Sequence, residues 1–263
     1  MQWTSRVLTG QQLDAFWRDG FLIVEDLVDP DLINRMAQQA DLIASGKASN
    51  IPDTFINLEK QFDATGGAGY DDRTTAVRKM YQLARHDQVL NEHACSVSVV
   101  DIIADLLRTD DLKLYNDQLF MKPAFHGAAQ DWHQDSQAWH NMFPMDLVTA
   151  WTAIDEATIE NGCLWMATGS HRWGMVPKQV KAEIEALFDD DWPTAPIALR
   201  PGSVSFHHSL TYHTSSPNRT ANRRRGYATH YMRARTWYDE EIRARPDLLP
   251  FVSIRGREFS GCV

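Results

Sequence analysis

The spacing of apolar residues divides the chain into two regions that meet near residue 111. In the first region three segments have apolar residues at helical spacing and are predicted helices: residues 10–19, 30–45 and 86–108. Thr9 is a suitable N-cap for the first of them, and Gly20 is a suitable end. Pro30 stands at the first position of the second, where its missing N–H costs nothing. The apolar run at 21–27 is a predicted short strand.

From Leu112 onward the chain consists of short segments rich in β-branched and aromatic residues. These segments are predicted strands and span residues 112–123, 148–156, 162–170, 202–208, 210–216 and 225–232. Turn signals such as Asn161-Gly162 and Pro201-Gly202 separate them, and one predicted helix at about 177–188 interrupts the series. The pattern predicts a mainly β fold with flanking helices (α+β), a sandwich or barrel supported by the N-terminal helices.

No repeat, low-complexity tract or linker divides the chain. We therefore expect a single domain over residues 1–263, with helical support over about 1–110 and the β core over about 111–235. Residues 46–78 lack periodicity and contain the sequence GGAG, so we expect a long, partly mobile excursion there. Part of it, residues 46–75, is a candidate lid over a binding site.

Composition limits the classes of function. The chain is 43% apolar with nine Trp, enough for a packed core, and its formal charge of −9 argues against non-specific nucleic-acid binding. Its three cysteines, Cys95, Cys163 and Cys262, have no CxxC spacing, which argues against a disulfide framework or a structural zinc site. No apolar run is long enough for a membrane helix, and no signal peptide is evident. We therefore expect a cytoplasmic protein without membrane or nucleic-acid partners.

The first candidate for chemistry is the segment His133-Gln134-Asp135. On a strand, His133 and Asp135 project from the same face, whereas Gln134 points elsewhere unless the strand twists or ends. An imidazole and a carboxylate suit Fe(II), Mn(II) or Zn(II), and a second histidine would complete the ligand set of non-haem iron oxygenases. Four downstream histidines are candidates, and alternation does not choose among them: His207, His208, His213 and His230.

The run of three arginines that follows these histidines discriminates better. On the strand that begins there, Arg224, Gly226 and Ala228 share one face. Gly and Ala leave space beside the guanidinium for an anionic co-substrate, and Arg suits bidentate binding of a carboxylate. Arg223 and Arg225 project from the other face and are expected to be solvated. Arg224 is therefore the predicted anion-binding residue.

Six motifs stand in the order and at the spacing of a known family. They are His133-Gln134-Asp135, Trp151 in VTAWTAIDE, Glu160-Asn161-Gly162, Gly169-Ser170-His171, the segment GSVSFHHSLTYHTSSPN and Arg224. With them the chain resembles the phytanoyl-CoA dioxygenase family of Fe(II)- and 2-oxoglutarate-dependent oxygenases, most strongly from Lys79 to Met232. The resemblance implies a double-stranded β-helix, that is, a jelly-roll or cupin-like barrel. It also implies hydroxylation of an unactivated C–H in a small organic metabolite, with Fe(II) as cofactor, 2-oxoglutarate and O2 as co-substrates, and release of succinate and CO2.

The resemblance assigns roles residue by residue. His133, Asp135 and His213 match the iron ligands of the catalytic centre. Arg224 matches the arginine that pairs with the far carboxylate of 2-oxoglutarate, and Ser215 matches a hydroxyl donor to that carboxylate. Three further residues match positions that contact the co-substrate in some members: Gln134, Trp151 and Lys79. Asp135 stands where the halogenase branch has Ala or Gly, so hydroxylation is favoured.

The sequence defines substrate recognition less well. Residues near the predicted mouth of the barrel are candidates for substrate contacts: Asn116, Gln118, Trp139, His140, Met142, Phe143 and Arg172. A core position for the aromatic residues, or a sheet-edge position for Asn116 and Gln118, is an equally good interpretation. His208 stands where the family commonly has Gly and is a further candidate for lining the pocket. Family membership alone does not fix the small-molecule substrate, and both a monomer and a homodimer fit the sequence.

Other functions use the same metal-binding residues. An iron site of this kind also supports desaturation, epimerisation and ring closure. A barrel whose oxygenase site had decayed would bind a ligand without catalysis, but His133, Asp135, His213 and Arg224 are all present. A zinc hydrolase would leave Arg224 and the open coordination positions without a role.

Overall fold

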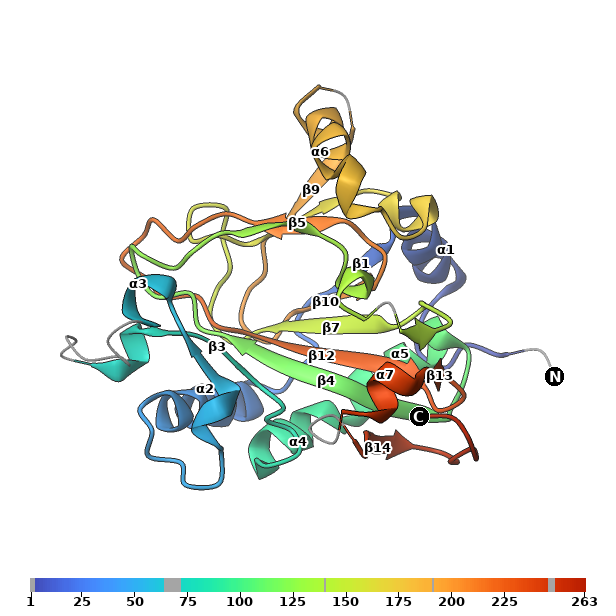
Figure 1. Ribbon diagram of the computed structural model, residues 1–263, viewed down its shortest axis with the longest axis horizontal. Coiled ribbons are helices and arrows are strands. Elements are labelled where there is room, and N and C mark those ends of the chain that lie inside the picture. The colour runs from blue at the N-terminus through green and yellow to red at the C-terminus, as the bar shows by residue number, and fades with distance from the viewer. Residues whose placement is uncertain (1–2, 64–71, 140, 191, 246–248) are drawn as a thin grey trace.

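The computed structural model describes residues 3–63, 72–139, 141–190, 192–245 and 249–263. Its strands form two facing sheets, and helices cover the outer face of the larger sheet (Figure 1). This is the mainly β architecture with supporting helices that the sequence pattern predicted. In the described residues the two sheets are separate and do not close into a barrel. The prediction of a single domain over the whole chain stays a prediction.

The larger sheet has eight antiparallel strands. In spatial order they are β1 (Phe21–Val24), β10 (Val204–His208), β7 (Val148–Ala153), β12 (Gly226–Arg233), β4 (Leu112–Phe120), β3 (Val77–Tyr81) and β2 (Ile56–Leu58), and β14 (Val252–Arg255) also pairs with β4. Every residue of β7 is buried, because helices pack on one face of this sheet and the smaller sheet lies over the other. Such a strand shows β-branched and aromatic enrichment rather than alternation.

The smaller sheet contains β5 (Gln130–His133), β11 (His213–Ser215), β8 (Leu164–Ala167) and β9 (Thr194–Ile197), in that order. Its register places His213 directly opposite His133. A separate two-stranded pair joins β6 (Met142–Phe143) to β13 (Trp237–Tyr238).

The helices are α1 (Gly10–Asp19), α2 (Pro30–Ala44), α3 (Lys60–Asp63), α4 (Gln88–Ala94), α5 (Val97–Leu107), α6 (Lys181–Asp190) and α7 (Glu240–Arg243). Short 3-10 segments lie at Asp53–Phe55, Arg73–Thr75, Asp135–Gln137, Ser170–Trp173 and Lys178–Val180. The predicted boundaries of α1 are confirmed: Thr9 and Gln12 form a capping box, and Gly20 ends the helix at φ 87°. Pro30 begins α2, and the side chain of Asp29 caps it.

The single helix predicted over 86–108 is wrong. The chain forms α4 and α5, and Ser96 interrupts them in an extended conformation at ψ 134°. The two helices pack on different partners, α4 against α2 and α5 against strands β7 and β12. One straight helix could not reach both surfaces, so tertiary packing overrides the continuous helical pattern.

The excursion predicted over 46–78 is partly wrong. Strands β2 and β3 extend the larger sheet, with Lys79 of β3 opposite Phe120 of β4. Val77 and Met80 are fully buried and hold β3 on the core. These strands are short and β3 contains Arg78-Lys79, so they lacked a clear strand signal. Residues 64–71, part of the predicted lid, lie outside the described residues.

The main hydrophobic core lies between the helices and the larger sheet. Phe16, Met36, Ile103, Phe206 and Tyr227 are fully buried there. This close packing holds the larger sheet rigid, so the side chains on its opposite face have fixed positions. None of the helices in the described residues is long and apolar enough to cross a membrane.

Candidate metal centre and co-substrate cavity

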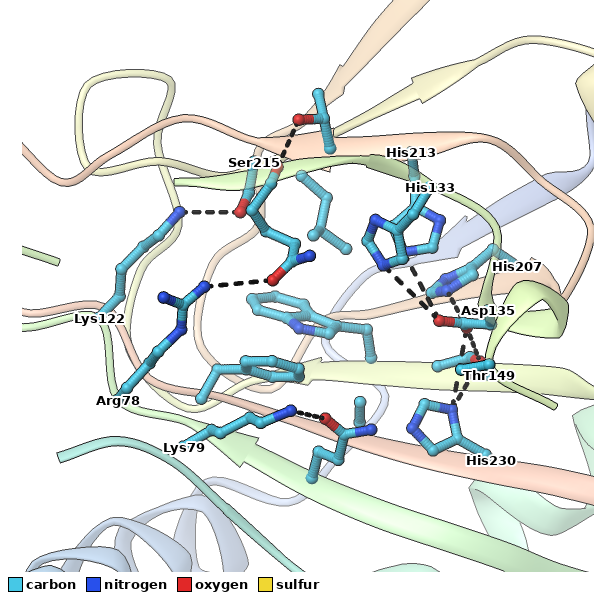
Figure 2. Close-up of a pocket in the computed structure, with 18 of the residues that line it drawn as sticks. Arg78, Lys79, Lys122, His133, Asp135, Thr149, His207, His213, Ser215 and His230 are labelled. Atoms are coloured by element: carbon cyan, nitrogen blue, oxygen red, sulfur yellow. Dashed lines mark hydrogen bonds and ion pairs between the residues drawn. The ribbon is translucent and has the colours of Figure 1, made fainter. Parts of the chain in front are cut away.

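A cavity of about 230 Å³ lies between the two sheets. Side chains of β3, β4, β7 and β12 form one wall, and side chains of β5, β8 and β11 form the facing wall. Figure 2 shows two differently composed ends. The metal end is defined by His133, Asp135 and His213, and the cationic end by Lys122, Ser215 and Arg224.

The three predicted iron ligands come together at the metal end. Strand pairing sets His133 beside His213, with ring centroids 4.2 Å apart, and Asp135 follows where β5 gives way to a 3-10 turn. Asp135 Oδ1 lies 4.0 Å from His133 Nε2 and 3.8 Å from His213 Nε2. One ligand atom from each residue lies within 4.8 Å of the other two. The three side chains can therefore hold one ion.

Backbone carbonyls orient both imidazoles. Asp131 O lies 2.7 Å from His133 Nδ1, and Thr211 O lies 2.9 Å from His213 Nδ1. A carbonyl only accepts, so each Nδ1 carries the hydrogen and each Nε2 presents its lone pair to the centre. Burial, and the neighbouring His213, lower the pKa of His133 to about 4, and burial also lowers the pKa of His213. Both rings are therefore neutral at pH 7, as metal binding requires. Two imidazoles and one carboxylate fit Fe(II).

A second group of side chains surrounds the other oxygen of Asp135. Thr149 Oγ1 donates to Asp135 Oδ2 at 2.9 Å, and His207 Nε2 lies 3.5 Å from the same oxygen. Burial opposes ionisation of Asp135, but the hydrogen bond with His207 and the surrounding imidazoles outweigh it and hold the pKa well below its usual range. Asp135 is thus ionised, with Oδ1 directed to the metal position and Oδ2 held by the protein (Figure 2).

The four candidate histidines occupy different positions relative to the metal end. His213 lies at the metal position, whereas His207 and His230 contact the carboxylate of Asp135 from the far side. His208 lies away from the cavity, its ring 5.5 Å from that of His171 and 6.0 Å from that of Trp17. Sequence reasoning did not identify the roles of Thr149, His207 and His230. The strand register would have found them, since Thr149 pairs with both histidines.

Arg224 lies at the cationic end and is only 2% exposed. Its guanidinium lies over the Trp151 ring, 5.2 Å from the centroid, and one Nη donates to Gly162 O at 2.5 Å. A Cβ at position 226 would overlap the Trp151 ring, so Gly226 is required for this arrangement. Burial lowers the pKa of Arg224 to about 10, which leaves it charged at pH 7. Its Nε is buried without a hydrogen-bond partner in the described residues.

The neighbouring arginines differ from the prediction in one respect. Arg223 is partly exposed and pairs with Asp41, in line with a surface role. Arg225 was expected to be solvated, but it is buried and forms two hydrogen bonds of 2.8 Å to the carboxylate of Asp155. Arg225 also donates to Ala37 O of α2, so its charge is buried against a helix and needs a partner.

Gln134 does not lie in the cavity. Its amide nitrogen donates to Gly174 O and Leu210 O, and its amide oxygen accepts from Val176 N at 2.7 Å. The predicted contact of Gln134 with 2-oxoglutarate is therefore corrected. The strand ends at His133, and the side chain turns outward to join two loops.

Other predicted residues divide between the cavity and its surroundings. Lys79, Gln118 and Trp151 line the cavity, and Lys79 Nζ lies 3.4 Å from Gln118 Oε1. Asn116 is not among the cavity-lining residues, because its amide oxygen accepts from the backbone N–H of Asp117. Its predicted substrate contact is corrected.

The segment after Asp135 is mostly core. Trp139 lines the cavity, whereas Met142 is fully buried in the hydrophobic cluster behind it that also contains Trp139, and Phe143 is exposed and packs against Trp237. Arg172 is exposed and does not line the cavity. The substrate contacts predicted for Met142, Phe143 and Arg172 are therefore corrected. His140 lies outside the described residues.

Several polar residues of the cavity had not been predicted. Arg78 Nη2 lies 3.3 Å from Gln130 Oε1, and Lys122 Nζ lies 2.9 Å from Ser215 Oγ (Figure 2). Glu59 is buried beside Arg78 at 3.9 Å. Neither Lys122 nor Glu59 carries a local sequence signal, because segments that are distant in sequence bring them to this cavity.

Comparison with known proteins agrees with this geometry. The phytanoyl-CoA dioxygenase (PhyH) family model matches residues 16–226. A probable phytanoyl-CoA dioxygenase of Caenorhabditis elegans is 26% identical, over 95% of this chain and 80% of that protein. The ectoine dioxygenase of Sphingopyxis alaskensis is 25% identical, over 65% of this chain and 53% of that protein.

Solved structures share the fold. EctD from S. alaskensis in its apo form superposes with a TM-score of 0.79 and 22% identity, over 98% of this chain and 90% of that one. The α-ketoglutarate-dependent epimerase SnoN superposes with a TM-score of 0.70 and 19% identity, over 96% of this chain and 94% of that one. The prediction of a double-stranded β-helix is confirmed.

Proposed function

Since the chain belongs to the phytanoyl-CoA dioxygenase family, it is an Fe(II)- and 2-oxoglutarate-dependent dioxygenase, and we propose that it hydroxylates an unactivated C–H of a small organic metabolite. The observation that supports this most strongly is the pairing of two ends in one cavity. A site for Fe(II) lies at one end, and at the other lies a buried arginine that has no carboxylate at hydrogen-bond distance in the described part of the chain. A zinc hydrolase would have no use for the second.

The residues of the two ends would have different binding roles. His133, Asp135 and His213 would hold the iron, which when bound supplies the activation of O2, with succinate and CO2 as products from 2-oxoglutarate. Arg224 would pair with the far carboxylate of 2-oxoglutarate, which would be costly to bury without a partner. Ser215 would donate a hydrogen bond to the same carboxylate. Trp151 would keep water away from that pair.

The substrate would occupy the remaining space between the metal end and the cavity mouth. Gln118, Lys79 and Trp139 line this space, two with polar ends and one with an apolar face. Lys79 would contact either the co-substrate, as the resemblance implies, or the substrate. A structural neighbour, EctD from S. alaskensis, has been solved with 2-oxoglutarate and 5-hydroxyectoine. Ectoine is therefore a reasonable first compound to assay.

Oxygen-isotope labelling tests the proposal. Fe(II)-loaded protein is incubated with 2-oxoglutarate, ectoine or other small metabolites, and 18O2. Hydroxylation places one labelled atom in succinate and one in the product. A product with the substrate's oxygen count but two hydrogens fewer, or of unchanged mass, would instead indicate desaturation, ring closure or epimerisation. Product oxygen derived from water, without succinate, would contradict the proposal.

A further inference from the structure

Lys122 is a buried basic residue at the cationic end that the proposed function does not use. It follows β4 and is 6% exposed. Its Nζ lies 2.9 Å from Ser215 Oγ and 3.3 Å from Gly162 O, and it also donates to Ser216 O (Figure 2). In the described residues, these three hydrogen-bond acceptors of Lys122 are all uncharged oxygen atoms.

The surrounding backbone has features that accommodate the buried side chain of Lys122. A Cβ on Gly162 would overlap Ser216 O and would lie 2.8 Å from Lys122 Nζ, so only glycine admits the lysine here. The backbone of Lys122 has a φ of 26°, which is unfavourable for a residue with a side chain. Its carbonyl accepts from Arg224 N at 3.1 Å. Both the backbone and the side chain of Lys122 are therefore tied to the segment that carries Arg224.

Two buried basic groups thus meet at one place. Lys122 Nζ and the guanidinium of Arg224 share the carbonyl of Gly162 as an acceptor. Arg225, one residue after Arg224, has the carboxylate of Asp155, whereas neither Lys122 nor Arg224 has a carboxylate at hydrogen-bond distance in the described residues. Unpaired buried charges are costly, so this end of the cavity is prepared for an anion.

The direction of the hydrogen bond to Ser215 adds a second effect. A hydroxyl has one hydrogen, and when Lys122 donates to Ser215 Oγ that hydrogen stays free for another acceptor. Ser215 lines the cavity, where its hydrogen can point to a bound carboxylate. Lys122 thereby sets Ser215 as a donor.

We propose that Lys122 is a positioning residue for 2-oxoglutarate, which adds positive charge behind the far carboxylate and orients the Ser215 hydroxyl toward it. This inference rests on the proposed function. It assigns Lys122 to selection among 2-oxo acids: acids with a second carboxylate gain from Lys122, and acids without one do not.

The charge of Lys122 follows the occupancy of the site. Burial and the nearby Arg224 lower its pKa to about 6, with smaller effects from Cys163, Arg78 and Glu59. A bound carboxylate raises this pKa again, so binding of 2-oxoglutarate takes up a proton. The affinity for 2-oxoglutarate, relative to an acid without the second carboxylate, should therefore fall as the pH rises above about 6.

Titration of two 2-oxo acids tests the proposal. Anaerobic Fe(II)-loaded protein is titrated with 2-oxoglutarate and with 2-oxobutyrate, which lacks the far carboxylate, and the visible charge-transfer band is followed. Lys122→Met should weaken 2-oxoglutarate binding roughly 10- to 100-fold, as expected for one hydrogen-bonded charge, and leave 2-oxobutyrate within about twofold. Lys122→Gln, which keeps a donor but no charge, should have a smaller effect. Lys181→Met on α6 is the control and should change neither affinity.

A double-mutant cycle separates positioning from a merely structural role. In the Ser215→Ala background, Lys122→Met should lose much of its effect on 2-oxoglutarate, because part of that effect acts through the hydroxyl. Equal losses for both acids, or fully additive effects, would overturn the inference. If Lys122→Met does not fold, the comparison of the two acids in Lys122→Gln decides. Absence of the band in iron-loaded wild-type protein would contradict the proposed function itself, whereas a normal wild-type band with variants that do not discriminate would contradict only the inference.

Discussion

The metal end and the cationic end of the cavity are built in different ways. At the metal end, antiparallel pairing of β5 with β11 sets His133 opposite His213, and backbone carbonyls orient both rings. At the cationic end, Lys122 lies just after β4 and Ser215 is the last residue of β11. Their side chains meet beside the turn at Gly162. Metal geometry is therefore fixed by sheet register, whereas anion binding depends on side chains brought together from distant loops.

The two ends also differ in charge before any ligand binds. The histidines of the metal end are neutral, since burial lowers their pKa values, and Asp135 is ionised. At the cationic end Arg224 is charged at pH 7, whereas Lys122, with a pKa of about 6, gains its charge when an anion binds, and neither has a carboxylate at hydrogen-bond distance in the described residues. Each end thus favours a ligand of opposite charge, and substitutions at the cationic end should leave Fe(II) binding intact.

The largest effect is expected from removal of a metal ligand. His213→Ala should abolish Fe(II) binding, because two ligands on one strand segment cannot hold the ion. His208→Ala should retain it, since this ring packs against Trp17 and His171. Iron stoichiometry after anaerobic loading measures both. Equal loss in the two variants would show that His208, not only His213, contributes to the centre.

The next largest effect is expected at the cationic end. Arg224→Leu should weaken 2-oxoglutarate binding by roughly a hundredfold, because the far carboxylate would be buried unpaired. Arg223→Leu should do little, as its partner Asp41 lies on the surface. Fe(II) binding should survive in both. If the two arginine variants have the same 2-oxoglutarate affinity, the assignment by strand face is wrong.

A smaller effect is expected from the support of Asp135. Thr149→Val removes the donor to Oδ2 and should weaken Fe(II) binding about tenfold, as is usual for residues that hold a metal ligand. Thr149→Ser keeps the hydroxyl and should restore most of the affinity. Competition with a chromogenic chelator measures the difference. Normal affinity in Thr149→Val would mean that the hydrogen bond does not orient the carboxylate.

The smallest effect is expected from pH at the metal end. Imidazoles with pKa values near the usual 6.5 would take up protons between pH 7.5 and pH 6, and Fe(II) affinity would fall steeply. Because His133 has a pKa of about 4, Fe(II) affinity should change less than about threefold over this interval and fall only at lower pH. Binding isotherms at the two pH values decide between these results.

The same contrast explains what could be predicted from the sequence. Alternation along a strand and family motifs identified His133, Asp135 and Arg224, because these signals are local. Alternation did not choose His213 over His208, since the chain turns between them and only the pairing with β5 decides. Lys122 carried no local signal, because its importance comes from Ser215, almost a hundred residues away.

The errors have a similar origin. Ser96 breaks a pattern that is helical on both sides, because α4 and α5 pack on different partners. Arg225 was predicted to be solvated because it belongs to a run of charges, but it is buried and paired with Asp155. Gln134 was assigned to the co-substrate by position in a motif, but three backbone groups occupy its amide. In each case a distant partner overrides what the neighbouring residues indicate.

We propose that one cavity binds Fe(II) at one end and 2-oxoglutarate between that ion and the other end. Anaerobic spectroscopic titration of the apoprotein, first with Fe(II) and then with 2-oxoglutarate, tests it most directly. We expect a weak visible charge-transfer band to appear only after the second addition and to saturate at one 2-oxoglutarate per iron. Bound iron without any band at saturating 2-oxoglutarate would contradict the claim and would favour a ligand-binding barrel without oxygenase activity.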